Sequence, residues 1–206
     1  MLPLPPVTQA LLLVNVGVFC LQFLFGGWVE RLFALWPLGE GFLPWQVVSY
    51  AFLHGSFGHL FFNMLGLWMF GGELERVWGP KRFLQYYMAS VLAAGLTQAI
   101  VTMNSLPYPT IGASGGIFGL LLGYAMMFPN RIIVPLIPPV PMKAKWFVLI
   151  YGLLELFLGV EGAAGGIAHF AHLGGMAGGY LMIRYWRGQP PFGRGGPRRP
   201  RPRIVR

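Results

Sequence analysis

The chain has 206 residues, of which 55% are apolar and only 10% are charged. Soluble domains carry about a quarter charged residues, so this composition excludes an ordinary soluble enzyme. The net charge of +9 would suit a nucleic-acid-binding protein, but the basic residues lie in short loops and one tail, not on an amphipathic face. We therefore expect a protein of the lipid bilayer and no nucleic-acid partner.

Apolar segments long enough, or nearly long enough, to cross a bilayer follow one another along the chain. They cover about residues 8–26, 57–72, 82–103, 113–128, 145–160 and 168–186. No basic segment precedes the first of them, which argues against a cleaved signal peptide, so we expect it to remain as an anchor. The predicted fold is all-α, a polytopic bundle of six transmembrane helices over residues 1–187.

The segment between the first two spans, residues 27–57, is too long for a turn. Among its prolines and glycines it carries Trp28, Phe33, Trp36, Phe42 and Trp45. Aromatic residues of this kind settle at the level of the lipid headgroups. We therefore predict a loop that lies partly in the outer leaflet.

The second span is short and carries His59 and Asn63 near its outer end, and polar residues at such depth indicate function. Four residues apart, the two share one helix face. They are candidates for an oxyanion hole, but taken alone they fit better an interhelical hydrogen-bonded pair. His54 and Ser56 are expected to cap or order the preceding loop.

Residues 109–119, at the start of the fourth span, read PTIGASGGIFG. This pattern places Ser114 at the outer start of a helix, where backbone N–H groups without helical partners can stabilise an oxyanion. Gly112 and Gly115 allow backbone and substrate to approach closely. The four-residue pattern by itself favours a capping serine among glycines used for helix packing.

The sixth span brings a candidate base, His172, to the same depth as Ser114. Glycines recur every four residues on both helices: Gly115, Gly119 and Gly123 on the fourth span, and Gly175 and Gly179 on the sixth. Two such smooth faces can pack closely, which would bring Ser114 and His172 into hydrogen-bond range. Phe118, one turn below Ser114 on the same face, is placed to stack on the imidazole.

His169 lies one turn before His172, and histidines spaced i, i+3 can bind a metal or haem. Such a site needs further ligands, for which His54 and His59 are candidates. No cysteine or acidic residue falls at a convincing spacing, so we predict no metal and no cofactor. His169 is expected to support the site or to pack against a neighbour.

The chain contains six glutamates and no aspartate, so a Ser-His-Asp triad cannot be assembled and serine catalysis would use a dyad. Phe118, in place of a carboxylate, would then hold the imidazole. A His-Glu-x-x-His zinc protease and an aspartyl protease are excluded as well. Glu155, within the fifth span, is a functional candidate expected to be protonated or hydrogen-bonded. Glu73 and Glu75 are expected to be structural anchors.

Lysine and arginine residues set the predicted orientation. All except Arg31 lie after the second span, after the fourth span or in the tail: Arg76, Lys81, Arg82, Arg131, Lys143, Lys145, Arg184, Arg187, Arg194, Arg198, Arg199, Arg201, Arg203 and Arg206. We therefore predict cytoplasmic termini and a site that opens to the extracytoplasmic side, most simply of a bacterial cytoplasmic membrane. Residues 188–206, rich in Arg, Pro and Gly, predict a disordered cytoplasmic tail near anionic headgroups, with RNA binding as the alternative.

Three motifs in order resemble those of the rhomboid family of intramembrane serine proteases, and the resemblance covers nearly the whole chain. They are His59-x-x-x-Asn63, residues 112–115 and residues 171–179. The resemblance implies that Ser114 attacks, that His172 is the base, and that His59, Asn63 and the Ser114 backbone N–H hold the oxyanion.

Two positions depart from the family's pattern. Phe118 stands where many relatives have a Tyr that stacks on the base, so a hydroxyl contact would be missing. Gln46, after Trp45, stands where relatives often have Arg, which affects the contacts within the first loop. We expect the minimal form of the family, without the extra helix or cytosolic domain of some relatives.

The resemblance implies an intramembrane serine endopeptidase that cleaves single-span proteins within or next to their transmembrane segments. A helical substrate must unwind locally, so we expect small or helix-breaking residues near its outer membrane boundary. The glycine-rich stretch 159–166 is expected to form a flexible cap beside a movable fifth helix. The alternatives are a non-catalytic relative that binds transmembrane helices, and a small transporter or metal-binding membrane protein. Neither the substrate's identity nor the oligomeric state follows from the sequence.

Overall fold

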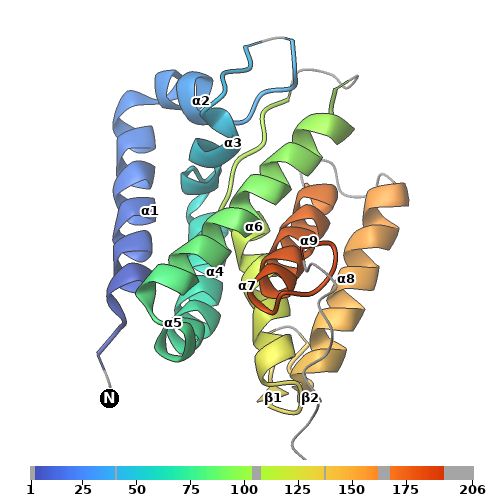
Figure 1. The fold of residues 1–206 in the computed structure, drawn as a ribbon. Helices are drawn as coiled ribbons and strands as arrows, with labels where there is room; N and C mark the ends of the chain where they lie inside the picture. Colours follow the sequence, from blue (N-terminus) through green and yellow to red (C-terminus); the bar gives the residue numbers. More distant parts are fainter. Residues whose placement is uncertain (1–2, 40, 104–107, 137, 162–167, 193–206) are drawn as a thin grey trace, which may run out of the picture.

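The computed structural model describes residues 3–39, 41–103, 108–136, 138–161 and 168–192, and most of them are helical (Figure 1). The long helical segments are α1 (Pro6–Phe25), α4 (Phe57–Gly66) continued by the π-helical turn η2 (Leu67–Gly71) and α5 (Gly72–Trp78), α6 (Pro80–Val101), α7 (Ser114–Met127), α8 (Ala144–Glu161) and α9 (His169–Trp186). Each corresponds to one predicted span, and the second continues beyond its predicted end to Trp78. The prediction of a helical fold is confirmed.

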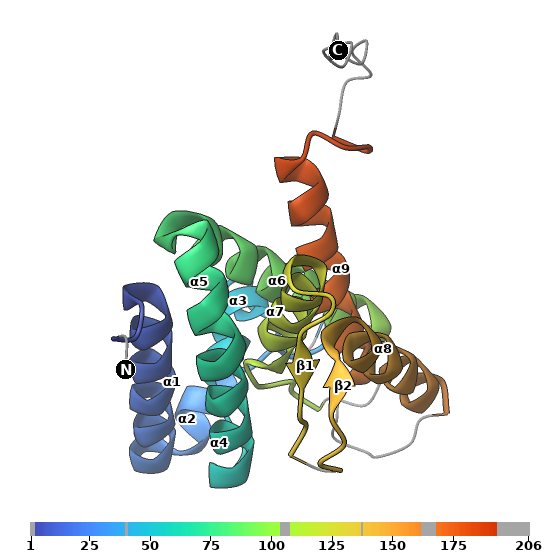
Figure 2. The same ribbon diagram turned by 90° about the horizontal axis from the view of Figure 1, so that it is seen from below.

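Helices α6, α7 and α9 pack against one another at the centre. Helices α1, α4 and α5 lie on one side of them and α8 lies on the other (Figure 2). The packing is close because of glycine: a Cβ built on Gly175 would lie 1.9 Å from the carbonyl oxygen of Gly115. The two glycine faces therefore meet as expected, but Gly119 and Gly179 also contact α6, where an added Cβ would meet Ser90 and Tyr86.

The outer surface of the bundle is apolar. On α8 alone, the residues at least 45% exposed include Leu149, Ile150, Leu153, Leu154, Leu156 and Phe157. Soluble monomers rarely expose a continuous apolar surface of this kind, which marks contact with a membrane or a partner. Within the described part of the chain, α1 and α6 are the helices whose length and hydropathy suffice to cross a bilayer, and α7 is a shorter apolar helix.

The segment between α1 and α4 is more ordered than the predicted loop, since it contains α2 (Gly27–Phe33), α3 (Gln46–Ser49) and the short helix η1 (Tyr50–Phe52). Gln46 organises it from a completely buried position. Its Oε1 accepts from the backbone N–H groups of Trp36 and Leu43, and its Nε2 donates to the carbonyls of Arg31, Leu32 and Gly41. A neutral amide thus forms hydrogen bonds with the backbone groups of this loop, at a position where relatives often have Arg.

A short hairpin that the sequence analysis did not predict joins α7 to α8. Strand β1 (Ile132–Ile133) pairs antiparallel with β2 (Met142–Lys143), and Ile133 is buried. The sequence here offers a run of three β-branched residues before a proline, which is shorter than the runs of about four to eight residues that predict a strand. Of the cap predicted over residues 159–166, residues 159–161 belong to α8 and residues 162–166 lie outside the described part. All residues after 192 lie outside it as well, so the disordered tail stays a prediction.

The start of α1, helix α5 and the hairpin lie together at the lower end of the bundle in Figure 1. Glu75 of α5 joins two of these parts, because its carboxylate accepts from the backbone N–H groups of Val7 and Thr8 at 2.9 and 2.7 Å and from the Thr8 hydroxyl at 2.7 Å. It thereby caps the start of α1. Glu73 forms an ion pair with Arg131, so both glutamates serve as the expected structural anchors.

We expect Glu75→Ala to lower the free energy of unfolding by about 3 kcal/mol, because two buried backbone donors and a hydroxyl lose a charged acceptor. The unfolding temperature in detergent measures this effect. Glu73→Ala is the matched control, since it removes only a partly exposed ion pair worth about 0–1 kcal/mol. Equal losses in the two variants would contradict the capping role of Glu75.

Candidate active site

Helix α7 begins inside the bundle, not at its edge. It has 14 residues, about 21 Å, against 22 residues and about 33 Å for α6. The chain before α7 therefore runs down into the bundle before the helix starts (Figure 1). Ser114 is the first residue of α7, so its backbone N–H has no partner within the helix.

The turn before Ser114 requires glycine. Gly112 has φ +126°, a backbone conformation that side chains rarely allow. A Cβ at this position would also lie 2.7 Å from Nε2 of His59, so the turn and the imidazole exclude any larger residue. The loop is held from outside by Leu35, which pairs with Thr110 through two backbone hydrogen bonds of 3.0 and 2.8 Å.

Ser114 and His172 are in direct contact. The Oγ of Ser114 lies 2.8 Å from Nε2 of His172, and the imidazole is buried. Phe118 stacks on the imidazole, with the ring centroids 4.2 Å apart and the planes inclined by 6°. The structure thus brings together the three side chains that the sequence analysis placed around one point, and Gly115 and Gly175 supply the close approach of their helices.

The side chains of His59 and Asn63 face the same site from α4. Ser56 accepts a hydrogen bond from the backbone N–H of His59 and so caps α4 as expected. Nδ1 of His59 accepts from the N–H of Gly55 at 3.4 Å, which leaves the proton of a neutral ring on Nε2, the atom that faces Gly112. Asn63 donates one amide hydrogen to the carbonyl of His59 at 2.9 Å, and its second amide hydrogen remains for another acceptor.

A cavity of about 1220 Å³ contains all of these groups. Its lining includes His59, Asn63, Ser114, Phe118 and His172, with Phe147 and Tyr151 of α8 and Ile133 of the hairpin among the surrounding apolar residues. Pockets for small ligands are usually no larger than about 1000 Å³. The size and apolar lining suit a segment of polypeptide better than a small polar molecule.

His54 lies beside this cavity and is not a ligand to a shared centre. Its backbone N–H donates to Oε1 of Gln22 and its carbonyl accepts from Nε2 of Gln22, so it joins α1 to the loop before α4. Its ring is buried edge-on to His59, with the centroids 5.1 Å apart. Burial, with a smaller effect of His59, lowers the pKa of His54 to about 4.

This lowered pKa predicts a stability that depends on pH. In the unfolded chain His54 takes up a proton near its ordinary pKa of about 6.5. In the folded chain the imidazole stays neutral until the pH falls to about 4. The contribution of neutral His54 to the free energy of unfolding is therefore fully present above about pH 6.5 and is lost as the pH falls from 6.5 toward 4. We expect the unfolding temperature of the parent protein to fall more between pH 7 and 4 than that of His54→Gln; parallel curves would contradict this assignment.

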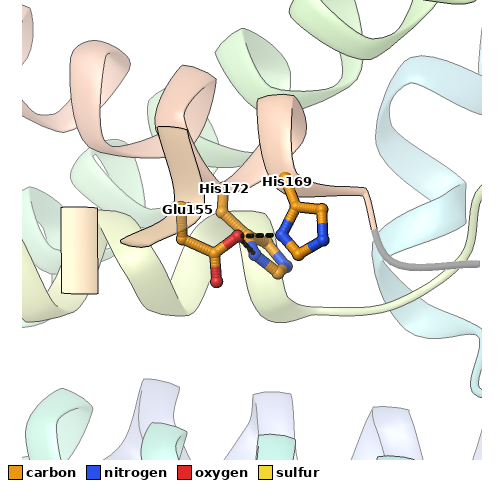
Figure 3. A group of neighbouring side chains, drawn as sticks. All are labelled: Glu155, His169 and His172. Atoms are coloured by element: carbon orange, nitrogen blue, oxygen red, sulfur yellow. Dashed lines mark hydrogen bonds and ion pairs between the residues drawn. The ribbon is translucent and has the colours of Figure 1, made fainter. Parts of the chain in front are cut away.

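Glu155 of α8, predicted as a functional candidate without an assigned partner, lies at the base (Figure 3). Its Oε2 lies 2.6 Å from Nδ1 of His169 and 2.9 Å from Nδ1 of His172. The expectation that no carboxylate reaches the base is therefore wrong. In the structure Glu155 shares one buried face of α8 with Ala144, Phe147 and Val148, and this face is turned toward the bundle.

Glu155, His169 and His172 also bring three possible metal-binding atoms within 4.8 Å of one another, which corrects the expectation that no acidic residue would join the histidines. The separation of 2.6 Å between Glu155 and His169 is nevertheless that of a hydrogen bond. Two ligands of one zinc ion, each about 2.1 Å from the metal, stand farther apart, at roughly 3 Å or more. The geometry therefore favours direct pairing of the three side chains.

Comparison with known proteins identifies the family of this chain. A family model described as the Rhomboid domain matches residues 42–188. The chain belongs to the rhomboid family. This confirms the resemblance of the three motifs, two of which supply the contacting pair Ser114 and His172.

Relatives in this family include proteases from several organisms. The chain is 30% identical over 182 residues to the Rhomboid protease GlpG of Klebsiella pneumoniae, an alignment that covers 86% of this chain and 62% of that protein. It is 33% identical over 188 residues to the Rhomboid protein 1, mitochondrial, of Saccharomyces cerevisiae, covering 85% of this chain and 52% of that protein. It is 34% identical over 139 residues to the Rhomboid protease GluP of Bacillus subtilis, covering 66% and 25%. The chain thus spans less than two thirds of the length of these relatives.

Proposed function

We propose that this chain is an intramembrane serine endopeptidase that hydrolyses peptide bonds within or next to the transmembrane segments of membrane proteins. The observation that carries the proposal is the 2.8 Å contact between Ser114 Oγ and His172 Nε2 at the open start of a helix. A hydroxyl in contact with an imidazole is the arrangement that activates a serine for attack. Membership of a family whose relatives include named proteases supports the same activity.

In the proposed reaction, His172 Nε2 takes the proton of Ser114 as Oγ attacks the substrate carbonyl carbon. The oxyanion that forms accepts hydrogen bonds from the Ser114 backbone N–H, from Nε2–H of His59 and from the amide of Asn63. The intermediate collapses to an acyl-enzyme as His172 passes the proton to the leaving amine. Water, deprotonated by His172, then hydrolyses the ester and restores the Ser114 hydroxyl. No metal or cofactor takes part.

We propose that the long helical segments span the membrane as a six-helix bundle, with the basic ends of α5, α6 and the hairpin in the cytoplasm. The apolar outer faces of the helices support the membrane-spanning arrangement. The orientation is supported by one end of the bundle, where the elements that carry Arg76, Lys81 and Lys143 lie together. The site would then open on the opposite, extracytoplasmic side of a bacterial cytoplasmic membrane. Ser114 starts a helix that is shorter than its neighbours, so water needs to enter only part of the bilayer.

The proposed substrates are single-span membrane proteins. A transmembrane helix hides its peptide bonds in i to i−4 hydrogen bonds, so the scissile bond becomes accessible only where the helix unwinds. Glycine and proline near the outer boundary lower the cost of unwinding. The large apolar cavity, with Ser114 on its wall, supports binding of such an unwound segment.

The test uses the full chain in proteoliposomes with a single-span reporter protein. One reporter carries a Gly-Pro-containing outer boundary, and a second carries leucine at the same positions. We expect cleavage of the first reporter within a few residues of its outer boundary, slower cleavage of the second, and none by Ser114→Ala. Binding of the reporter without cleavage would contradict the protease and support a non-catalytic helix-binding protein.

A further inference from the structure

The buried carboxylate of Glu155 has a place in the site that the Ser114–His172 pair does not explain. It comes from α8, whereas the two imidazoles that it contacts come from α9 (Figure 3). One oxygen, Oε2, faces both rings: Nδ1 of His169 at 2.6 Å and Nδ1 of His172 at 2.9 Å. All three side chains are buried. An ionised carboxylate in such surroundings is costly unless it is paired, so its partners define its role.

The contact with His172 involves the nitrogen on the far side of the ring from the serine. A neutral imidazole can take a proton through Nε2 only when the ring hydrogen is on Nδ1. An ionised carboxylate only accepts hydrogen bonds, so Glu155 beside Nδ1 favours the form in which Nε2 faces Ser114 as a base. The same negative charge stabilises the imidazolium that forms when His172 takes the serine proton.

The two histidines differ in how well their Nδ1 atoms align with the Glu155 carboxylate. The pair of Glu155 and His169 meets the geometry of a hydrogen bond. His172 Nδ1 lies at ion-pair distance from the same oxygen but has no well-aligned acceptor among the residues that the structure describes. Rotation about the last torsion of a glutamate is soft, so the carboxylate can align with His172 at small cost. Catalytic hydrogen bonds often tighten in this way only when substrate binds.

His169 completes the arrangement by holding the carboxylate in place. Its Nδ1–H donates to Oε2 of Glu155, and its ring lies edge-on to His172 with the centroids 6.4 Å apart. Among the described residues it forms no hydrogen bond with Ser114, whose partner is His172. Phe118 covers the face of His172, so the ring is fixed by a stacking contact from α7 and by a charge from α8.

Resting on the proposed protease function, we propose that Glu155 is a positioning residue that orients the general base and stabilises its protonated form. This chain would then use a Ser114–His172–Glu155 relay. His169 holds the carboxylate within this relay. Because the carboxylate belongs to α8, any movement of α8 away from α9 also removes it from the base. The site is therefore complete only when these two helices are in contact.

The test compares Glu155→Gln with the parent protein in the proteoliposome assay. Glutamine keeps the size and one oxygen of the side chain but lacks the charge. We expect kcat to fall about 10- to 100-fold, as when an outer partner of a functional imidazole is removed, with KM unchanged because Glu155 does not touch substrate. Glu155→Asp, which keeps the charge, should recover part of kcat. Glu161→Gln is the matched control on the same helix, at an exposed position.

The outcomes separate this inference from the proposed function. If the parent protein cleaves and Glu155→Gln has a kcat within twofold of it, the positioning role is wrong while the protease stands. If the parent protein does not cleave, the protease itself is wrong. Stoichiometric zinc in the purified parent protein that Glu155→Gln loses would overturn the relay in favour of a metal site. Should Glu155→Gln fail to fold, Glu155→Met, which is apolar and of similar length, must show the same loss of kcat.

Discussion

A His172→Ala variant is expected to lose about six orders of magnitude in kcat, comparable to the loss of the base histidine in other serine proteases. The reason is that Nε2 of His172, 2.8 Å from Oγ of Ser114, is the only base in direct contact with the nucleophile among the described residues. KM should change little, because the cavity that holds the substrate remains. The measurement is steady-state cleavage of the single-span reporter.

His169→Ala is the matched control for this prediction. It stands one turn away on α9, is also buried and also pairs with Glu155, but the hydrogen bond to Ser114 comes from His172. We expect it to retain at least a tenth of the parent kcat, since its role is to hold the carboxylate. Equal losses in the two variants would mean that activity depends on the integrity of α9 and not on a base at residue 172.

The second large effect is predicted for Gly175→Ala, a change of one methyl group. The added Cβ would lie 1.9 Å from the backbone carbonyl oxygen of Gly115, and a backbone atom cannot turn aside as a side chain does. Helices α7 and α9 must therefore separate by roughly 1.5 Å to reach ordinary contact distance. This separation breaks the hydrogen bond between Ser114 and His172.

We expect Gly175→Ala to reduce kcat/KM at least about 100-fold, the cost of a misplacement of about 1 Å at a catalytic group, and to lower the free energy of unfolding by about 1–3 kcal/mol. Gly152→Ala on α8 is the control, since its Cβ would meet only the flexible end of Met176 at 3.3 Å. Both variants are assayed for cleavage and for thermal unfolding in detergent. Full activity of Gly175→Ala would contradict the close packing of α7 on α9.

The helical segments were predictable because a bilayer imposes a simple rule of length and polarity. The predicted spans agree with the helices to within a few residues at nearly every end. The meeting of Ser114 and His172 was predictable for a different reason: glycines every four residues define faces that can touch, and both residues stand at the outer ends of their predicted spans.

Features that depend on contacts between distant segments could not be predicted from the sequence. Glu155 was predicted to be a carboxylate within the bilayer, but the rotation of α8 that turns it toward α9 is set by packing. The hairpin at Ile132 and Ile133 is too short to leave a clear alternation pattern. The burial of Gln46 follows from five backbone groups that converge only in the folded loop.

Labelling of the purified protein with a fluorophosphonate tests the central claim most directly, because this probe modifies only a serine that a neighbouring base has activated. We predict one phosphonylated residue, identified by mass spectrometry as Ser114, and loss of the label in His172→Ala at an unchanged unfolding temperature. Absence of labelling in the folded parent protein, or equal labelling of Ser114 in His172→Ala, would contradict catalysis by the Ser114–His172 pair.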